Sequence, residues 1–313
     1  SVYWSIDEYG ELLLEPVSGT SGNLDSFTGT FTDSLTTTAA NGKTYNTGYN
    51  INVTNSTAPW YSSRANIKSF RIADGCTIGV NPMASGSTTI TSLSTMFANC
   101  ANLTDVDLTG LNTAQVTDLS GMFFGCTALK SIDVAAISTT AATTMRMMFA
   151  NCHVLETIEN VNFANTMTSD FSWMFADCLK LDGLKLTGLN DDNDVISTFG
   201  TSYATTFKGM FARCESLSSI DVSQFNTARV TDMQFMFFKN YQMTQIDLTD
   251  WINNTQSLTA MNSMFQDCTR LQQLDLSNFF YNIGDEIAAS NLTTMAYAFS
   301  GCTNLTKVDL SSL

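Results

Sequence analysis

The sequence predicts an α/β solenoid, because one short motif recurs along most of its 313 residues. The motif reads Leu-x-x-Met-Phe-x-x-Cys-x-x-Leu-x-x-Val-Asp-Leu, and its apolar positions follow a helical spacing and then an alternating one. The first three steps between its phenylalanines are each 26 residues long, a period typical of leucine-rich-repeat-type solenoids. The phenylalanines of the successive repeats are Phe97, Phe123, Phe149, Phe175, Phe211, Phe237, Phe265 and Phe299.

The first half of each repeat has the spacing of a short helix. In the first repeat Leu93, Met96, Phe97 and Cys100 fall at positions i, i+3, i+4 and i+7, which lie on one face of a helix. Hydroxyl or acidic side chains stand just before this stripe, as Thr91 does, and are typical of helix N-caps. We interpret the recurring Met-Phe pairs as core, because they keep the same phase in nearly every repeat.

The second half of each repeat has the spacing of a short strand. Leu103, Val106 and Leu108 alternate, and Asp107 points to the opposite side. A single rung cannot bury its apolar face alone, so the rungs are expected to stack into one parallel sheet. We therefore expect about eight rungs of short helix plus short parallel strand over residues 67–313.

Residues 1–66 lack the repeat and are predicted to form a β-rich cap. Residues 2–6 alternate as a strand does, Asp7–Gly10 offers a turn, and Leu12–Leu14 can supply the partner strand of a hairpin. Solenoid ends expose core, so this segment is expected to shield the first rung, with Trp4 and Trp60 in the core of the cap.

Composition limits the classes of partner. The net charge is −15 and the pI is about 4.2, which disfavours nucleic-acid phosphates and anionic lipid. No apolar run approaches the roughly 20 residues that a membrane span needs. Because the chain starts at Ser1 without a methionine, we interpret it as a mature or trimmed product.

Cysteine positions predict structural thiols. Seven of the eight cysteines occupy one slot of the repeat, three residues after the phenylalanine, and Asn240 takes that slot in the sixth repeat. Such a slot needs a small side chain that faces inward and can hydrogen-bond nearby backbone. We expect these thiols to be buried and reduced, since parallel side chains rarely reach disulfide geometry. They are Cys100, Cys126, Cys152, Cys178, Cys214, Cys268 and Cys302.

An outward row of charged residues is the first candidate binding site. In a parallel, in-register sheet the position of Asp107 becomes a row of like charges, with Arg71 at one end and Lys185 inside it. Two interpretations stay open: a hydrated face with hydrogen bonds between rungs, or a weak cation-dependent or basic-partner surface. The row comprises Asp107, Asp133, Glu159, Lys185, Asp221, Asp247, Asp275 and Asp309.

Two insertions between strand and next helix are the second candidate. About ten extra residues lie within Asn190–Ala204 and about eight within Asn278–Ser290, and insertions on one face often form a binding face. Phe280 and Tyr281 are either exposed anchors or local packing.

The acidic run of the first insertion raises the question of a calcium site. The carboxylates are Asp191, Asp192 and Asp194. Their spacing does not match an EF-hand loop, so a solvated acidic loop is the preferred interpretation and a metal site the weaker one.

The repeat motif resembles that of the BspA-like family of bacterial leucine-rich-repeat surface proteins. The match is closest to the Met-Phe-rich variant of mycoplasma lipoproteins and of surface proteins from gut and lactic bacteria. The residues that carry it are Val116–Phe123, Cys126, Leu129 and Ile132–Val134, with Ala58–Tyr61 in the leading segment. The resemblance implies display on the bacterial surface or secretion, with adhesion suggested for some members, and provides no catalytic residues.

The residues themselves give no sign of catalysis. His153 is the only histidine, and its neighbour Cys152 belongs to the inward row. No zinc-ligand spacing or phosphate-binding glycine loop appears, so we expect no enzyme activity and no cofactor.

We therefore expect a monomeric, secreted or cell-surface bacterial binding or adhesion protein. It would recognise a protein or glycan of a host or neighbouring cell through the sheet face and the inserted loops. The alternative is a structural spacer or stalk without a ligand. A distant alternative is a glycoside or peptide hydrolase, which would need paired carboxylates around a cleft.

Overall fold

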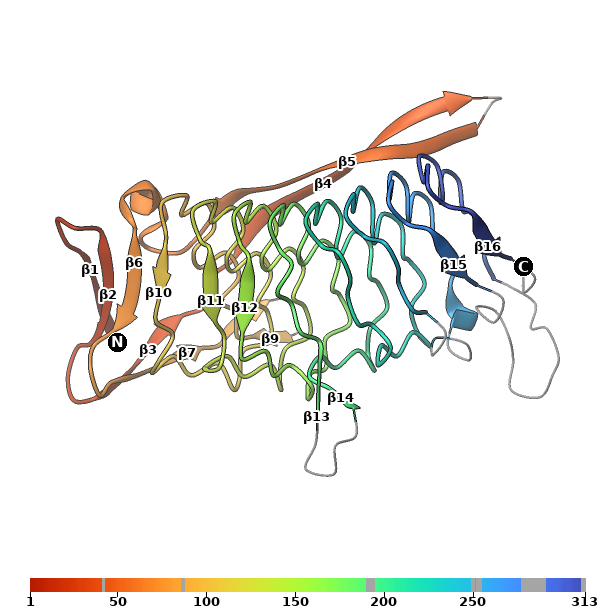
Figure 1. Cartoon of the computed structure of the whole chain (residues 1–313). Helices are drawn as coiled ribbons and strands as arrows, with labels where there is room; N and C mark the ends of the chain where they lie inside the picture. Colours follow the sequence, from red (N-terminus) through yellow and green to blue (C-terminus); the bar gives the residue numbers. More distant parts are fainter. Residues whose placement is uncertain are drawn as a thin grey trace.

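The computed structural model describes residues 1–40, 43–85, 88–189, 195–248, 251, 255–276 and 291–310. The repeats stack as successive turns of one elongated coil, here called the repeat array (Figure 1). The strands before the first repeat are β1 (Val2–Ile6), β2 (Glu11–Pro16), β3 (Ser21–Asp25), β4 (Gly29–Ala40), β5 (Lys43–Ser56), β6 (Ser69–Ile72), β7 (Thr77–Asn81), β8 (Met83–Ser85) and β9 (Thr88–Ile90). Those within the repeats are β10 (Asp105–Val106), β11 (Ser131–Asp133), β12 (Thr157–Glu159), β13 (Thr187–Leu189), β14 (Val195–Ser197), β15 (Gln273–Asp275) and β16 (Lys307–Asp309).

The predicted α/β class is wrong. In the described part of the chain there is no α-helix, and the helical segments are the 3₁₀ turns η1 (Tyr61–Asn66) and η3 (Thr255–Ser257). The segment predicted as a helix is a run of tight turns. Thr95 and Asn99 have φ angles of 60° and 59°, whereas an α-helix requires negative φ throughout.

Hydrogen bonding explains why these turns replace a helix. The N–H of Met96 donates to Leu93 O within the rung, whereas the N–H of Phe97 donates to Met122 O in the next rung. Alternate N–H groups thus close turns and join rungs, so the backbone is satisfied without a helix. Because the turns recur at fixed positions, Leu93, Met96, Phe97 and Cys100 still point inward, each at most 1% exposed. The predicted helix N-caps are wrong for the same reason.

Like side chains stack over one another in the core. From Phe97 to Phe299 the repeat phenylalanines form one continuous stack, with ring centroids 5.3–6.2 Å apart in successive pairs. Outside the core, the side chain of Thr117 donates to Thr91 O at 3.1 Å, and the equivalent hydroxyls of later rungs repeat this bond. The turns and these hydrogen bonds between rungs hold the apolar side chains inward, the role predicted for short helices.

All eight cysteines lie in the described part of the chain and are free thiols. Six of those in the repeat slot donate to the phenylalanine carbonyl of the preceding rung, as Cys152 does to Phe123 O at 3.1 Å. The predicted inward placement is confirmed for six of the seven slot cysteines, and Cys302 in the last repeat is half-buried. Asn240 differs, because its amide is fully buried and has no hydrogen-bond partner among the described residues.

The prediction of one parallel sheet through all rungs is wrong, because the described strands form a four-stranded sheet at the N-terminal end and separate two-stranded sheets in later repeats. Strands β1 and β2 form the predicted hairpin, and β2 continues in parallel to β6 and β10. Trp60 is fully buried and donates its indole N–H to Met96 O, whereas Trp4 remains 40% exposed beside it. The N-terminal segment is thus hydrogen-bonded directly to the first repeat.

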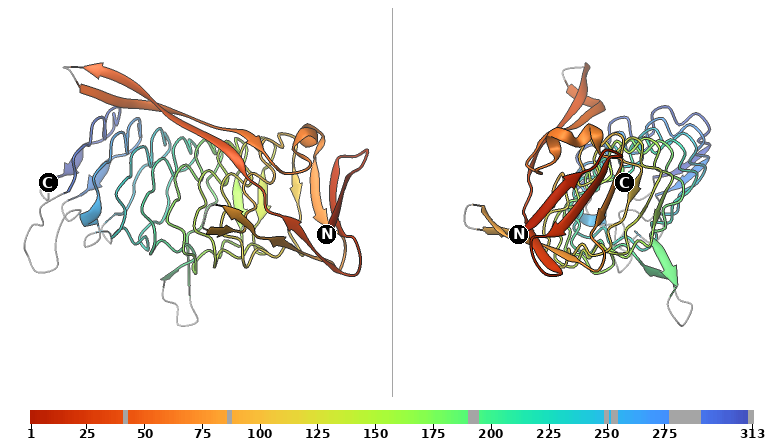
Figure 2. Two further views of the ribbon diagram at one scale, coloured as in Figure 1. Left: turned by 180° about the vertical axis from the view of Figure 1, so that it is seen from behind. Right: turned by 90° about the vertical axis from the view of Figure 1, so that its left-hand side faces the viewer.

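A long β-hairpin extends from this segment across the repeats. Strands β4 and β5 pair in antiparallel fashion and lie along the outside of the array, reaching toward its C-terminal end (Figures 1 and 2). We call residues 29–56 the strap. Tyr45 of the strap contacts Tyr297 of the last repeat, with ring centroids 5.6 Å apart.

The strap covers a second apolar cluster, separate from the core of the array. We call this contact zone the seam. It contains Ile51, Val53, Ala98, Phe124, Met147, Ala150, Trp173, Ala176, Ala212, Phe235 and Phe238. The seam joins residues far apart in sequence, as the hydrogen bond from Ser263 to Asn46 O shows.

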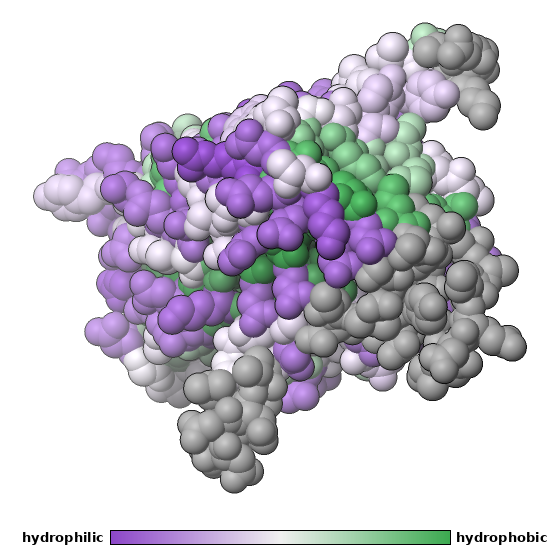
Figure 3. Space-filling view, turned by 45° about the vertical axis from the view of Figure 1, so that its right-hand side comes forward, coloured by the Kyte–Doolittle hydropathy of each residue, from purple (hydrophilic) through white to green (hydrophobic). Residues whose placement is uncertain are grey.

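The two ends of the array differ in burial. Met295, Phe299 and Leu305 in the last repeat are half-buried, although their counterparts in inner rungs are fully buried. Figure 3 shows apolar surface below the strap toward this end. Among the described residues, no helix is long and apolar enough to cross a bilayer.

Candidate functional site

The structure places the predicted charged row on one outer face of the array, here called the ladder face. Strand register sets Asp133 opposite Glu159 and Asp275 opposite Asp309. All eight members of the row lie in the described part, and all are exposed except the half-buried Asp309. The sequence therefore placed these side chains on a common face, although it assigned the other half of the rung incorrectly.

Several carboxylates of the row also hold local turns. Asp107 accepts the N–H of Thr109 at 2.9 Å, and Asp133 accepts that of Ala135 at 2.8 Å. The backbone hydrogen bond from Thr109 lowers the pKa of Asp107. Asp107 therefore stays ionised at neutral pH, and both carboxylates have a structural role beside any binding role.

Arg71, at the head of the row, is engaged elsewhere. Its guanidinium pairs with Glu11 at 3.1 Å and with Asp74 at 3.5 Å. Arg71 is thus paired with carboxylates outside the row, and the members of the row that follow it form a mainly negative face.

Lys185 interrupts the row and lines a hollow of about 560 Å³. Rung residues Glu159 and Asn160 form one side of this ladder hollow, and Thr187 and Thr198 at the bases of β13 and β14 form the other. Asn160 donates to Asp133 at 2.9 Å, which fixes the amide beside the carboxylate row. The ladder hollow therefore places one cation among fixed polar groups.

A second hollow of about 630 Å³ lies farther along the same face, lined by Asp221 and Asp247. Partial burial raises the pKa of Asp221, but hydrogen bonds from Ser223 and Thr187 outweigh it, so the pKa is lowered overall. The ladder face thus has two hollows, one lined by Glu159 and the other by Asp221 and Asp247.

Some predicted site residues lie outside the described residues. These are Phe280 and Tyr281 of the second insertion and Asp191, Asp192 and Asp194 of the first. In the described part, no cluster of three or more His, Cys, Asp or Glu side chains could hold a metal ion.

Burial raises the pKa of six of the seven slot thiols and makes them poor nucleophiles. Burial raises the pKa of Cys100 to about 12, so its thiolate is scarce at neutral pH. Cys152 is fully buried, whereas its neighbour His153 is exposed. The pair therefore lacks the geometry of a nucleophile and its base.

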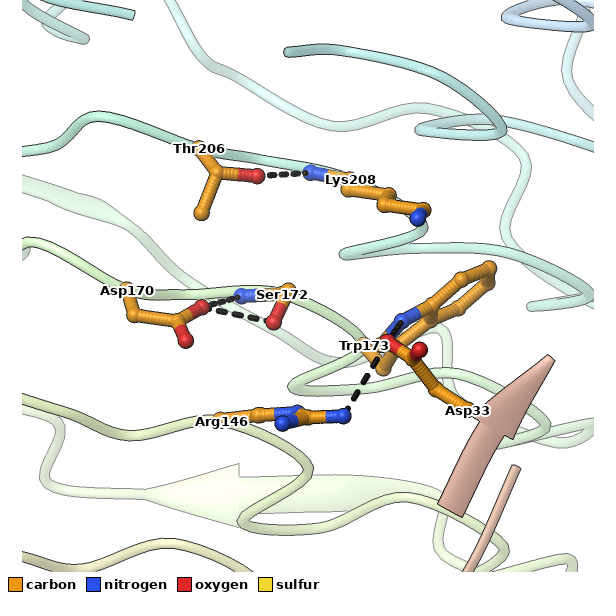
Figure 4. Close-up of polar contacts among 7 residues, drawn as sticks. All are labelled: Asp33, Arg146, Asp170, Ser172, Trp173, Thr206 and Lys208. Carbon is orange, nitrogen blue, oxygen red and sulfur yellow. Dashed lines mark hydrogen bonds and ion pairs between the residues drawn. The ribbon is translucent and has the colours of Figure 1, made fainter. Parts of the chain in front are cut away.

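The seam contains a site that the sequence interpretation missed. Figure 4 shows one part, where Asp33 of the strap accepts the indole N–H of Trp173 and pairs with Arg146, both at 3.0 Å. Aligning the repeats by slot would have shown Trp173 as one of several large side chains, Met147 and Phe235 among them, in a slot that holds glycine, serine or threonine in other rungs. Such an alignment would not have found its partner Asp33, which lies outside the repeats.

A cleft of about 420 Å³, here called the seam cleft, lies beside this contact, between the strap and the rung turns. At its base the buried Asp177 pairs with Arg213 at 2.6 Å and accepts the Tyr49 hydroxyl at 3.1 Å. Burial raises the pKa of Asp177, and Arg213 and Tyr49 oppose that rise. Burial also raises the pKa of Tyr49. The cleft therefore has a rigid, hydrogen-bonded base.

The wall of the seam cleft combines both parts of the chain. The strap supplies Thr36, Thr47, Gly48, Tyr49, Asn50 and Ile51, and the rungs supply Asn151, His153, Asp177, Arg213, Glu215, Phe238, Lys239 and Tyr241.

A protein-family model and a solved structure match this chain. A model of the family described as "Mycoplasma protein of unknown function, DUF285" matches residues 86–189 and 184–312. Among solved structures, a leucine-rich repeat protein from Eubacterium ventriosum is 16% identical, with a TM-score of 0.30 over 99% of this chain and 82% of that one. No curated protein matches the chain.

Proposed function

We propose a surface-binding role for this chain, which belongs to the family of mycoplasma proteins of unknown function, DUF285. In this proposal the chain is displayed outside a bacterial cell and binds a partner protein through the ladder face. The partner would present basic side chains to the row of carboxylates.

The ladder hollow at Lys185 is the observation that carries this proposal. A row made of carboxylates alone would attract any cation, but one lysine at a fixed place rejects a basic side chain there. Attraction along the row and repulsion at Lys185 together define a register for the partner. The neighbouring Asn160 and Thr187 add hydrogen-bonding groups at the same point.

The charge of the molecule supports a basic partner. The chain carries a net charge of −15, and ionised carboxylates such as Asp107 and Asp221 lie on the exposed ladder face. Such a surface accelerates encounter with cationic proteins, and salt weakens the effect. The hollows and the carboxylate row interrupted by Lys185 favour a binding role over that of a spacer without a ligand.

Binding to arrays of extracellular matrix proteins, cell-surface proteins and glycans tests the proposal. We expect saturable binding to a basic protein that weakens as salt rises. The combined variant Asp221→Asn, Asp247→Asn and Asp275→Asn should bind about tenfold or more weakly. At position 221 asparagine can still accept the N–H of Ser223, and at all three positions the negative charge is removed.

Asp7→Asn is the matched control, because Asp7 accepts the backbone N–H groups of Tyr9 and Glu11 but lies outside the row. It should bind as the unaltered protein does. Absence of saturable binding on all arrays would favour the spacer. Binding that is equal in the triple variant would remove the ladder face as the site, and glycan binding alone would replace the protein partner.

A further inference from the structure

The backbone around the seam cleft uses residues poorly suited to its conformation. The position before each repeat cysteine has a positive φ in every rung, and six of the eight residues there are Asn, Gly or Asp. These residue types tolerate the left-handed region, whereas long side chains are uncommon there. The eight residues are Asn99, Gly125, Asn151, Asp177, Arg213, Lys239, Asp267 and Gly301.

The two exceptions are neighbours and both line the seam cleft. Arg213 has a φ of 56° and Lys239 a φ of 58°. The adjacent rungs therefore place two cations in the cleft, at positions where asparagine would adopt the positive φ at a lower energetic cost. Long side chains also adopt positive φ at another slot of the repeat, as at Met147, Trp173 and Phe235, so the distinctive feature of this cleft is its pair of adjacent cations.

The two cations differ in how they are held. Arg213 is fixed by Asp177 and by Glu215, the latter at 3.5 Å. Lys239 lies over the Phe238 ring at 5.1 Å and has no carboxylate partner within 4.0 Å among the described residues. Lys239 is therefore the cation available to an incoming anion, and Arg213 is a positioned neighbour.

Both carboxylates of the wall, Asp177 and Glu215, pair with Arg213. Apart from Lys239 and His153, the remaining polar groups of the wall are uncharged. Thr36, Thr47 and Asn50 approach from the strap, and Asn151 and Tyr241 from the rungs. A cleft of about 420 Å³ falls in the size range of small-molecule sites. One available cation among hydroxyl, amide and phenol groups matches a small polyol that carries one carboxylate.

We propose that the seam cleft binds a sugar acid. The carboxylate would pair with Lys239, and the ring hydroxyls would hydrogen-bond to Asn151 and the strap hydroxyls. This site is separate from the ladder face, and the inference does not depend on the proposed function. A free sugar acid and a terminal sugar acid on a glycan share this chemistry.

Calorimetric titration of the whole chain tests the proposal with three ligands. D-glucuronate carries both the carboxylate and the hydroxyls, D-glucose lacks the charge, and succinate lacks the hydroxyls. We expect saturable binding of glucuronate, at least about tenfold tighter than that of either other ligand. An immobilised glycan ending in glucuronate, compared with the free sugar, distinguishes the two sources, and binding of either one supports the site.

The variant Lys239→Asn separates binding from folding. Asparagine already occupies this slot at Asn99 and Asn151, so the variant should fold with an unchanged or higher melting temperature. It should bind glucuronate at least about tenfold more weakly. Lys130→Gln removes an exposed lysine outside the cleft and should bind as the unaltered chain does.

Three results would overturn the proposal. They are no saturable binding of glucuronate in either form, equal binding by Lys239→Asn, and equal affinity for glucose or succinate. The first two remove the site and the third removes the ligand class. Binding at the ladder face is measured separately with the aspartate variants, so failure of one proposal is distinguishable from failure of the other.

Discussion

The core of the repeat array and the seam bury apolar side chains in different ways. In the core, each residue packs on its own equivalent in the next rung, as Phe149 does on Phe175 with nearly parallel rings. In the seam, unlike residues meet, and Tyr49 of the strap contacts Trp173 and Phe235 at different angles. The repeat period alone produces the core, because equivalent residues of successive rungs pack on one another. The seam instead depends on particular residues of the strap and of the array that fit one another.

The largest expected effect is in the core. Phe149→Ala leaves a cavity between two stacked rings in the middle of the array, and should lower the free energy of unfolding by about 3–5 kcal/mol. Chemical denaturation measures this loss. Phe149→Leu is the matched control and should lose much less. A loss below 1 kcal/mol in the alanine variant would mean that the stack is not a close-packed core.

A smaller and local effect is expected in the seam. Tyr49→Ala removes ring contacts with Trp173 and the hydroxyl that bonds the buried Asp177. We expect a loss of about 1–3 kcal/mol. Hydrogen exchange should rise in the strap while the core stays protected. Equal acceleration of exchange in both regions would show that strap and array unfold as one unit.

A stabilising change is expected where the core departs from its own pattern. Asn240→Cys replaces an amide without partners by the thiol that other rungs use, and should raise stability by about 1 kcal/mol. The melting temperature reports this gain. Asn240→Ser is a control of similar size that keeps a polar hydroxyl. A destabilised cysteine variant would indicate that the amide has a partner.

The weakest effect is a dependence on pH. Burial raises the pKa of Asp118 and of Asp232 above the usual 3.8, so the folded chain holds these protons more tightly than the unfolded chain. Their contribution to stability is lost as pH rises through the raised pKa. Melting temperature should therefore rise as pH falls from neutral to about 4.

Below that pH the trend should reverse, because Asp107 and Asp221 have lowered pKa values and lose their contribution when protonated. The double variant Asp118→Asn and Asp232→Asn can still accept the N–H groups of Ser120 and Gln234. It should flatten the rise above pH 4. An unchanged profile would assign the pH dependence to other groups.

The period predicted which residues are buried, but not the backbone that buries them. The spacing of Leu93, Met96, Phe97 and Cys100 fits a helix and also fits successive tight turns, because both place these four residues inward. The residue before each cysteine distinguishes the two, since recurring Asn, Gly and Asp indicate positive φ. The outward row depended on the strand half, and its position was predicted.

The sequence pattern did not predict where the strap docks. Residues 29–56 have the threonine-rich alternation of a hairpin, yet no local pattern indicates the surface they cover. That surface includes Met147, Trp173 and Phe235, which appear in sequence as irregular members of one repeat slot. The seam cleft was missed for the same reason, because its two walls meet only after the array has formed.

The strap also bears on the order in which the chain matures. Ser263 bonds to Asn46, and 217 positions separate them. Synthesis from the N-terminus completes the hairpin long before its distant docking site exists, so the strap stays undocked until the last repeats have formed. Its high content of threonine and asparagine, with few large apolar residues, suits a segment that is in water until the last turns are in place.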